Sequence, residues 1–155
     1  MMKLSLPRER DARDLAGRLA GVCPRDFVIY LHGDLGTGKT TLARAMIKAL
    51  GHDGAVRSPT YTLIEPYEVS GRRIFHLDLY RLADPGELEY LGLRDLLSEE
   101  AVLLVEWPSR GRGMLPEPDL ECHLDHAGSG RRLELVARSA RGETVLARFE
   151  GNVSA

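Results

Sequence analysis

The chain has 155 residues, of which 43% are hydrophobic and 28% are charged; these proportions predict one globular domain over residues 1–155 and exclude a disordered chain. A net charge of −2 provides no overall field for direct binding of nucleic acid, and two distant cysteines exclude a disulfide framework. No apolar run approaches the roughly 20 residues of a membrane span, so we expect a cytoplasmic protein with no membrane contact.

The first predicted elements are a short strand and a helix. Residues 3–6 form a candidate strand, and residues 11–19 place three apolar side chains on one helical face. Gly21 and Pro24 interrupt this pattern, so the helix is expected to end before the next apolar segment.

A glycine-rich motif follows, between a predicted strand and a predicted helix. Residues 27–31 form an apolar, β-branched and aromatic run that is typical of a buried strand. Residues 33–40, Gly-Asp-Leu-Gly-Thr-Gly-Lys-Thr, fit G-x-x-x-x-G-K-[ST] at every fixed position. Residues 41–50 then have apolar side chains at helical spacing, and Gly51 provides the stop. This order directs backbone N–H groups and a helix N-terminus at one point, which predicts a site for the polyphosphate of a nucleotide.

The residue types in this loop predict its contacts with the nucleotide phosphates and Mg²⁺. Lys39 is expected to reach the β- and γ-phosphates, and the Thr40 hydroxyl is expected to bind Mg²⁺. Thr41 begins the helix and adds a hydroxyl or N–H group near the phosphates, and Thr37 lies within the phosphate-binding loop. Three glycines allow close backbone approach and left-handed angles: Gly33, Gly36 and Gly38.

Beyond the glycine-rich unit the pattern becomes rich in strands. Residues 58–62, Ser-Pro-Thr-Tyr-Thr, form either a switch-like contact to the γ-phosphate or the metal, or a proline turn, and the local sequence favours the turn. Residues 60–69 and 72–79 predict a hairpin around Ser70-Gly71, with Pro66 confining the first strand to an edge. Because a hairpin cannot extend a parallel βαβ pattern, the sheet should be mixed.

The second half predicts a helix start, a buried strand and a β-rich tail. Residues 84–87, Asp-Pro-Gly-Glu, have the features of a helix N-terminus, and residues 101–105 are fully apolar. The tail is expected to form antiparallel strands at residues 120–124, 132–137 and 144–149. Together these elements predict an α/β fold of the P-loop NTPase type, with three α/β/α layers and a mixed, partly antiparallel central sheet.

P-loop chemistry also needs an acid at the end of a second buried strand, where it holds the metal or its waters. Glu106 follows five apolar residues, and Asp78 lies at the end of an alternating strand. One acid would hold Mg²⁺ while the other orients or deprotonates the attacking water, and the sequence leaves that division open. The alternative for each carboxylate is a group at a strand edge that is solvated or ion-paired and has no role in the site.

Three further residues are candidates with simpler alternatives. Arg81 would neutralise transition-state charge or form a surface ion pair. Trp107 would stack on a base or a partner, or simply pack. Arg131 would contact the adenine end of the nucleotide, as would its neighbour Arg132, or be solvated.

The local sequence around the histidines gives little indication of a function. A zinc site at Cys122, His123 and His126 lacks a convincing fourth ligand nearby, so we set it aside. His32 and His76 are expected in the core or behind the site.

Four segments resemble, in order and spacing, the bacterial TsaE (formerly YjeE) ATPases. They are residues 33–41, 58–63 (Ser-Pro-Thr-Tyr-Thr-Leu), 76–82 (His-Leu-Asp-Leu-Tyr-Arg-Leu) and 105–108 (Val-Glu-Trp-Pro), within a resemblance that covers roughly residues 5–140. Thr37 stands where alanine is commoner in that family, and we expect this change to face away from the glycines with little consequence.

The resemblance implies an ATP- and Mg²⁺-dependent hydrolase that supports the synthesis of threonylcarbamoyladenosine in tRNAs that read codons starting with A. It also implies docking on TsaD, the threonylcarbamoyl transferase subunit, and on its inactive paralogue TsaB, with tRNA engaged only indirectly. By motif, it assigns phosphate and Mg²⁺ contacts to Lys39 and Thr40, the acidic metal-side role to Glu106, support of hydrolysis to Asp78, and activity or docking to the segments of Thr60 and Trp107.

Two other functions share the glycine-rich motif. A small-molecule or nucleoside kinase usually carries a lid with several arginines, whereas residues 81–100 contain only Arg81 and Arg94. A non-catalytic, nucleotide-dependent switch would recruit a partner without hydrolysis, and the presence of both Asp78 and Glu106 argues against it.

Overall fold

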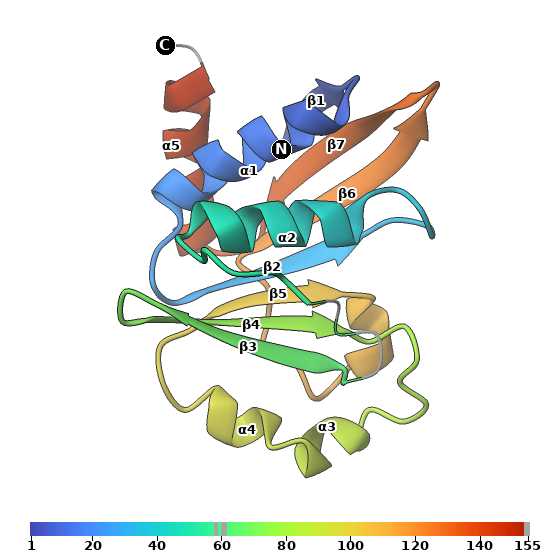
Figure 1. Ribbon diagram of the computed structural model, residues 1–155, viewed down its shortest axis with the longest axis vertical. Helices are drawn as coiled ribbons and strands as arrows, with labels where there is room; N and C mark the ends of the chain where they lie inside the picture. Colours follow the sequence, from blue (N-terminus) through green and yellow to red (C-terminus); the bar gives the residue numbers. More distant parts are fainter. Residues whose placement is uncertain (58, 60–61, 154–155) are drawn as a thin grey trace.

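A computed structural model describes residues 1–57, 59 and 62–153 and has a seven-stranded sheet at its centre (Figure 1). The strands are β1 (Met2–Leu6), β2 (Phe27–His32), β3 (Ile64–Val69), β4 (Arg72–Asp78), β5 (Val102–Glu106), β6 (Leu120–Ala127) and β7 (Gly130–Ala137). The helices are α1 (Glu9–Val22), α2 (Lys39–Ala49), α3 (Glu87–Tyr90), α4 (Leu93–Leu96) and α5 (Ala140–Val153), with a 3₁₀ turn η1 (Pro108–Gly111).

The sheet is mixed, as the hairpin signal predicted. Its strand order is β1-β7-β6-β2-β5-β4-β3, so β2 lies at the centre. β2 pairs in parallel with β5 and β6, and β4 pairs in parallel with β5. The hairpins β3–β4 and β6–β7 add antiparallel pairs, and β1 lies antiparallel to β7. Pro66 lies in the edge strand β3, where a residue without an N–H group is tolerated.

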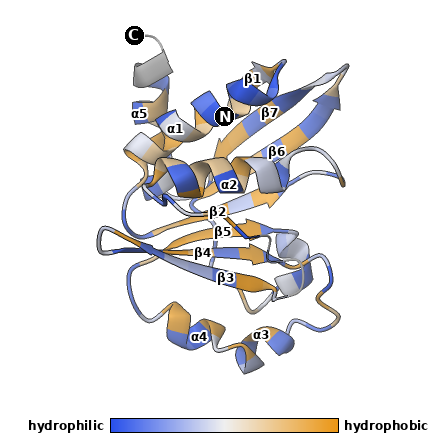
Figure 2. Cartoon of the chain, viewed as in Figure 1, coloured by the Kyte–Doolittle hydropathy of each residue, from blue (hydrophilic) through white to orange (hydrophobic). Residues whose placement is uncertain are grey.

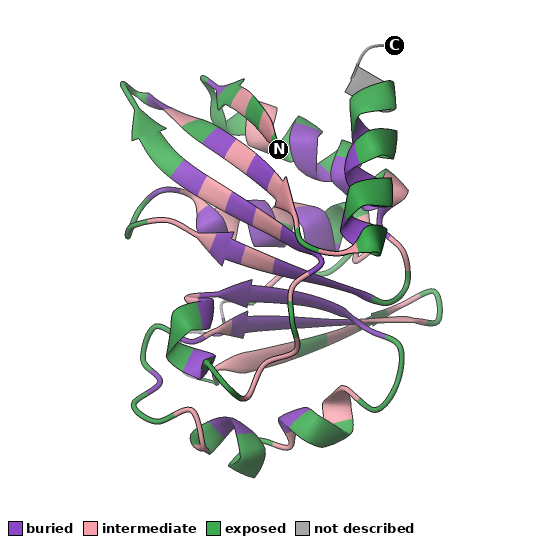
Figure 3. Cartoon of the chain, turned by 180° about the vertical axis from the view of Figure 1, so that it is seen from behind, coloured by how far each residue is buried: buried purple, intermediate pink, exposed green. Residues whose placement is uncertain are grey.

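Helices cover both faces of the sheet, which confirms the predicted three layers. α1, α2 and α5 lie on one face, where Leu19, Leu42 and Phe149 are fully buried. The short helices α3 and α4 lie on the other face through Leu88 and Leu93. Figure 2 shows how strongly apolar the central strands are, and Figure 3 shows buried residues alternating with more exposed ones along β6 and β7. Among the described residues, no helix has the length and apolar character needed to cross a bilayer.

Most predicted elements are confirmed, with small shifts at their ends. The helices expected at 11–19 and 41–50 are α1 and α2, and Gly51 follows α2 with a φ of 124°. β3 begins at Ile64, later than the predicted residue 60. Leu63 explains the delay, because it has a φ of 67° and its N–H donates to the Pro59 carbonyl at 2.8 Å, in a turn rather than a strand.

The prediction of a strand at residues 144–149 is wrong, since this segment lies inside α5. Val145, Leu146 and Phe149 are buried at helical spacing against the first helical layer. Ser139 provides the start signal that the sequence reading missed: its hydroxyl accepts a hydrogen bond from the backbone N–H three residues later, at 3.0 Å. An apolar pattern of only six residues fits both the strand period of two and the helix period of about 3.6. Here the hydrogen bond at Ser139 favours the helix.

A buried carboxylate joins the central strand to the C-terminal helix. Asp119 is 4% exposed, and its Oδ2 accepts hydrogen bonds from the Val28 N–H at 2.9 Å and from Arg141 at 3.1 Å. Its Oδ1 accepts from the Ser139 hydroxyl at 2.6 Å. This one side chain therefore holds together segments more than ninety residues apart.

Replacing Asp119 with alanine is expected to lower the free energy of unfolding by roughly 2–4 kcal/mol, because buried donors lose their acceptor. Urea denaturation measures the change. Asp26→Ala is the matched control, since Asp26 bonds the same Arg141 from a 54%-exposed position. We expect that control to change stability by no more than about 0.5 kcal/mol. Equal losses in the two variants would contradict the assignment.

Candidate functional site

The predicted site residues meet because the carboxyl ends of parallel strands lie at the same edge of the sheet. β2 leads into the glycine-rich loop, while β4 and β5 end at Asp78 and Glu106. These two acids are register partners, and Glu106 is also the partner of Leu31, two residues before the loop. The topology thus places both candidate acids beside the loop.

The loop needs glycine where it leaves β2 and where it enters α2. Gly33 has a φ of 150°, and a Cβ there would lie 2.5 Å from the Thr37 hydroxyl and 2.6 Å from the Leu124 carbonyl oxygen. Gly38 has a φ of 100° and precedes the first residue of α2. Any other residue at Gly33 would displace the loop, which explains the first fixed glycine of the motif.

Thr37 does not face away from the glycines, so that expectation is wrong. Its side chain is buried against Gly33, and its hydroxyl donates to the Asp34 carbonyl at 2.8 Å. Alanine would fit here, but it would fill less of the space and could not make this hydrogen bond. Thr37 therefore holds the loop's shape from within.

Lys39 begins α2 and reaches back across the loop. Its Nζ donates to the Gly33 carbonyl and lies 3.6 Å from the centroid of the Trp107 ring. Burial lowers the pKa of Lys39, and the nearby carboxylates of Glu106 and Asp78 oppose that shift. The ammonium is thus partly stripped of water and held at the point where phosphate oxygens are expected.

Glu106 is held in one orientation by two partners. It is 2% exposed, its Oε1 accepts a hydrogen bond from the Thr40 hydroxyl at 2.7 Å, and its Oε2 lies 2.7 Å from His76 Nε2. His76 is fully buried, and its Nδ1 has no hydrogen-bond partner within the described part of the chain. His76 therefore lies behind the site, as expected, and positions the Glu106 carboxylate.

Asp78 lies at the end of β4, half-buried beside Glu106. Its Oδ1 accepts from the Tyr80 N–H at 3.2 Å. Burial raises the pKa of Asp78, and the negative charge of Glu106 raises it further. A carboxylate with a raised pKa accepts a proton more readily than an ordinary one, which suits a general base.

The oxygen atoms at this edge of the sheet fit a hard divalent cation. Mg²⁺ prefers oxygen ligands and is usually bound by one or two carboxylates together with substrate phosphates. Thr40 and Glu106 are close enough to share one ion, and Asp78 adds a second carboxylate beside Glu106. The donor set therefore matches the metal that the motif predicts.

Trp107 covers the lysine in a strained backbone conformation. Its φ and ψ are 56° and 51°, in the left-handed region that a bulky residue rarely adopts. The ring packs on Tyr80, with centroids 5.0 Å apart, and lies over Lys39. Strain of this kind is common at functional sites, and here it turns the ring toward the phosphate-binding loop.

Arg131 supports the loop from β7. Its Nε donates to the Thr37 carbonyl and its Nη2 to the Gly36 carbonyl, both at 3.0 Å. These contacts are to the loop backbone, so the contact of Arg131 with adenine stays a prediction. The neighbouring Arg132 is exposed.

The loop and both acids line one cavity of about 600 Å³, which is large enough for a nucleotide. Thr41 and Arg81 also line it. One wall, which the sequence did not predict, comes from the end of β1, the turn after it and the start of α1: Leu6, Pro7, Arg8, Glu9 and Ala12. No local signal marks these residues, because they reach the loop through tertiary contacts, namely the pairing of β1 with β7 and the packing of α1 on α2.

Two groups of candidates from the sequence remain. Ser58, Thr60 and Tyr61 of the hydroxyl-rich segment lie outside the described residues. In residues 81–100, where a kinase would carry its lid, Arg94 forms an ion pair with Glu89 at 2.9 Å on the exposed surface.

The comparisons with known proteins agree with this geometry. The family model "Threonylcarbamoyl adenosine biosynthesis protein TsaE" matches residues 6–133. A Haemophilus influenzae protein named "tRNA threonylcarbamoyladenosine biosynthesis protein TsaE" is 48% identical over 123 residues, which cover 79% of this chain and 78% of that protein. An Aquifex aeolicus protein of the same name is 39% identical over 114 residues, covering 72% of this chain and 80% of that protein.

A solved structure shares the whole architecture. The crystal structure of Bacillus subtilis YdiB matches with a TM-score of 0.84 and 26% sequence identity, covering 98% of this chain and 95% of that one. Together with the strand, loop and helix described above, this match confirms the predicted P-loop NTPase fold. The chain belongs to the TsaE family of threonylcarbamoyl adenosine biosynthesis proteins.

Proposed function

We propose that this protein binds ATP and hydrolyses it with Mg²⁺, in support of threonylcarbamoyladenosine synthesis on tRNA. The proposed partners are a TsaD-type transferase subunit and its TsaB-type paralogue, in the cytoplasm, with tRNA engaged only through them. One observation carries the proposal: Lys39, Thr40, Asp78 and Glu106 line one cavity beside the phosphate-binding loop.

The residues divide the work as follows in this proposal. The loop N–H groups and Lys39 hold the phosphates, and Lys39 exchanges its bond to the Gly33 carbonyl for one to a phosphate oxygen. Thr40 and Glu106 would hold Mg²⁺, and the ion would supply positive charge to neutralise the charge that develops on the phosphates. Asp78 orients the attacking water and accepts its proton, consistent with its raised pKa.

The test is product analysis with and without the partner complex. We expect slow release of phosphate to water by the protein alone and faster release when TsaD and TsaB are added. Transfer of phosphate to an added nucleoside or metabolite would instead support the kinase, which the exposed Arg94–Glu89 pair already disfavours. Nucleotide-dependent partner binding without any acceleration of hydrolysis would support the non-catalytic switch.

A further inference from the structure

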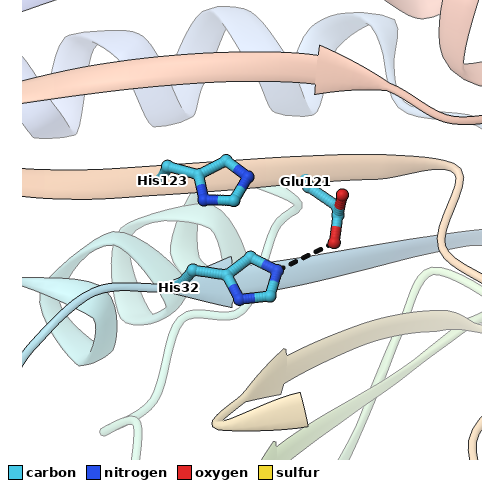
Figure 4. A group of neighbouring side chains, drawn as sticks. All are labelled: His32, Glu121 and His123. Atoms are coloured by element: carbon cyan, nitrogen blue, oxygen red, sulfur yellow. Dashed lines mark hydrogen bonds and ion pairs between the residues drawn. The ribbon is translucent and has the colours of Figure 1, made fainter. Parts of the chain in front are cut away.

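The face of the sheet opposite α1, α2 and α5 carries a cluster of polar side chains. The proposed hydrolysis does not use this cluster. His32 ends β2, while Glu121 and His123 come from the neighbouring strand β6 (Figure 4). All three are half-buried. They share a face because strand residues alternate, and Cys122, between the last two, is fully buried in the opposite core. This also explains why Cys122 and His123 cannot share an ion.

The two imidazoles lie directly against each other. His32 and His123 are register partners across the parallel pair of β2 and β6. Their rings stack with centroids 4.5 Å apart and planes only 8° apart, and His32 Nε2 lies 2.8 Å from Glu121 Oε1. One ligand atom from each residue falls within 4.8 Å of the others. Two ligands of a tetrahedral zinc ion lie about 3.3 Å apart, so the three atoms are already near the required spacing. Because imidazole binds a metal in the plane of its ring, the two rings would have to turn out of their parallel stack to share one ion.

Neighbouring side chains hold the cluster in place. Arg138 Nε donates to Glu121 Oε2 at 2.5 Å, which leaves Oε1 directed at His32. The Tyr30 ring lies edge-on to His32, and its hydroxyl is anchored by the Pro116 carbonyl at 2.5 Å. Supporting partners of this kind are typical around metal ligands.

We propose that His32, Glu121 and His123 form a binding site for a divalent transition-metal ion, zinc in the first instance. Two imidazoles and a carboxylate suit Zn²⁺ far better than Mg²⁺, which prefers oxygen ligands only. Three protein ligands leave a fourth position open. Both imidazoles line a cavity of about 340 Å³, and this cavity gives that position access to water or a small ligand.

The alternative is a polar cluster without a metal, in which His32 and Glu121 simply bond each other. That pair gives no role to His123, whose ring lies directly against His32 and lines the same cavity. A shared metal ion accounts for the position of all three side chains.

This site is separate from the expected Mg²⁺ position but shares a wall with it. The 340 Å³ cavity is also lined by Gly33 and Lys39, so the ion would lie behind the phosphate-binding loop. The inference does not depend on ATP hydrolysis, because its test measures metal binding alone.

The experiment is a Zn²⁺ titration of the full chain against a chromogenic zinc indicator, with Mg²⁺ in excess to occupy the oxygen ligands. We expect one tightly bound zinc ion per chain. His32→Gln and His123→Gln should each weaken binding at least about 10-fold, since each removes a ligand. His126→Gln is the matched control, because His126 is an exposed residue of the same strand. Binding that is absent in the wild type, or lowered equally by the control, would overturn the proposal.

A second measurement on the wild type guards against variants that fail to fold. Co²⁺ in place of Zn²⁺ should give visible absorption bands of a four- or five-coordinate site without a thiolate charge-transfer band, because both cysteines are buried away from the cluster. Imidazole ¹⁵N shifts on addition of Zn²⁺ should move for two histidines and not for His126. A thiolate band, or a shift at His126 alone, would refute the assignment.

Discussion

The Lys39→Ala variant is expected to bind ATP about 30- to 150-fold more weakly than the wild type, because a charge-assisted hydrogen bond contributes roughly 2–3 kcal/mol. The fold should remain intact. Burial lowers the pKa of Lys39, so the folded state holds this charge at a cost that alanine removes. Isothermal titration calorimetry with Mg²⁺ present measures the affinity, and circular dichroism checks the fold.

Lys48→Ala provides the matched control for this variant. Lys48 lies in the last turn of the same helix and is exposed. Its removal subtracts the same charge from α2 at a distance from the loop, so ATP affinity should be unchanged. Equal affinities for wild type and Lys39→Ala would remove the lysine from the site, whereas equal losses in both variants would indicate a general effect of charge.

The Glu106→Ala variant is expected to retain ATP binding and to lose Mg²⁺-dependent hydrolysis. A preorganised electrostatic group of this kind stabilises the transition state by roughly 2–4 kcal/mol, which corresponds to a rate decrease of roughly 30- to 1000-fold. The effect should be large because Glu106 is buried and already oriented by Thr40 and His76. Single-turnover phosphate release with the partner complex present measures it.

One further variant separates the effect of charge from that of side-chain size, and a second is a control. Glu106→Gln keeps the size of the side chain and removes its charge, so it should lose hydrolysis nearly as fully as alanine. Glu100→Ala removes an exposed carboxylate just before β5 and should behave as the wild type. Unchanged turnover in Glu106→Gln would show that its negative charge is not needed and would shift the acidic role to Asp78.

Much of this architecture could be predicted because strong local signals agreed with the tertiary structure. The apolar run of β2, the glycine-rich loop and the helical spacing of α2 each indicated the same unit. Pro66 marked an edge strand, and the hairpin signal around Ser70-Gly71 implied a mixed sheet. Asp78 and Glu106 could be placed together because both followed strands whose ends meet at one edge.

The errors came from contacts that have no local signature. Residues 144–149 fit a strand or a helix equally well until Ser139 is seen to cap α5. Thr37 was placed facing away because a sequence does not show which way a loop side chain points. The pairing of His32 with His123 depends on β2 and β6 being neighbours, although ninety residues separate them. Such pairings become visible only when the strand order is known.

The position of β1 has a consequence for synthesis of the chain on the ribosome. The phosphate-binding loop is translated within the first third of the chain, but β1 is held in the sheet by β7, which ends at Ala137. The turn after β1 lines the nucleotide cavity, and Arg131 of β7 bonds the loop backbone, so both supports are complete only when nearly the whole polypeptide has emerged. A nascent chain stalled before β7 should therefore retain a nucleotide less well than the full chain, although its glycine-rich segment is already complete.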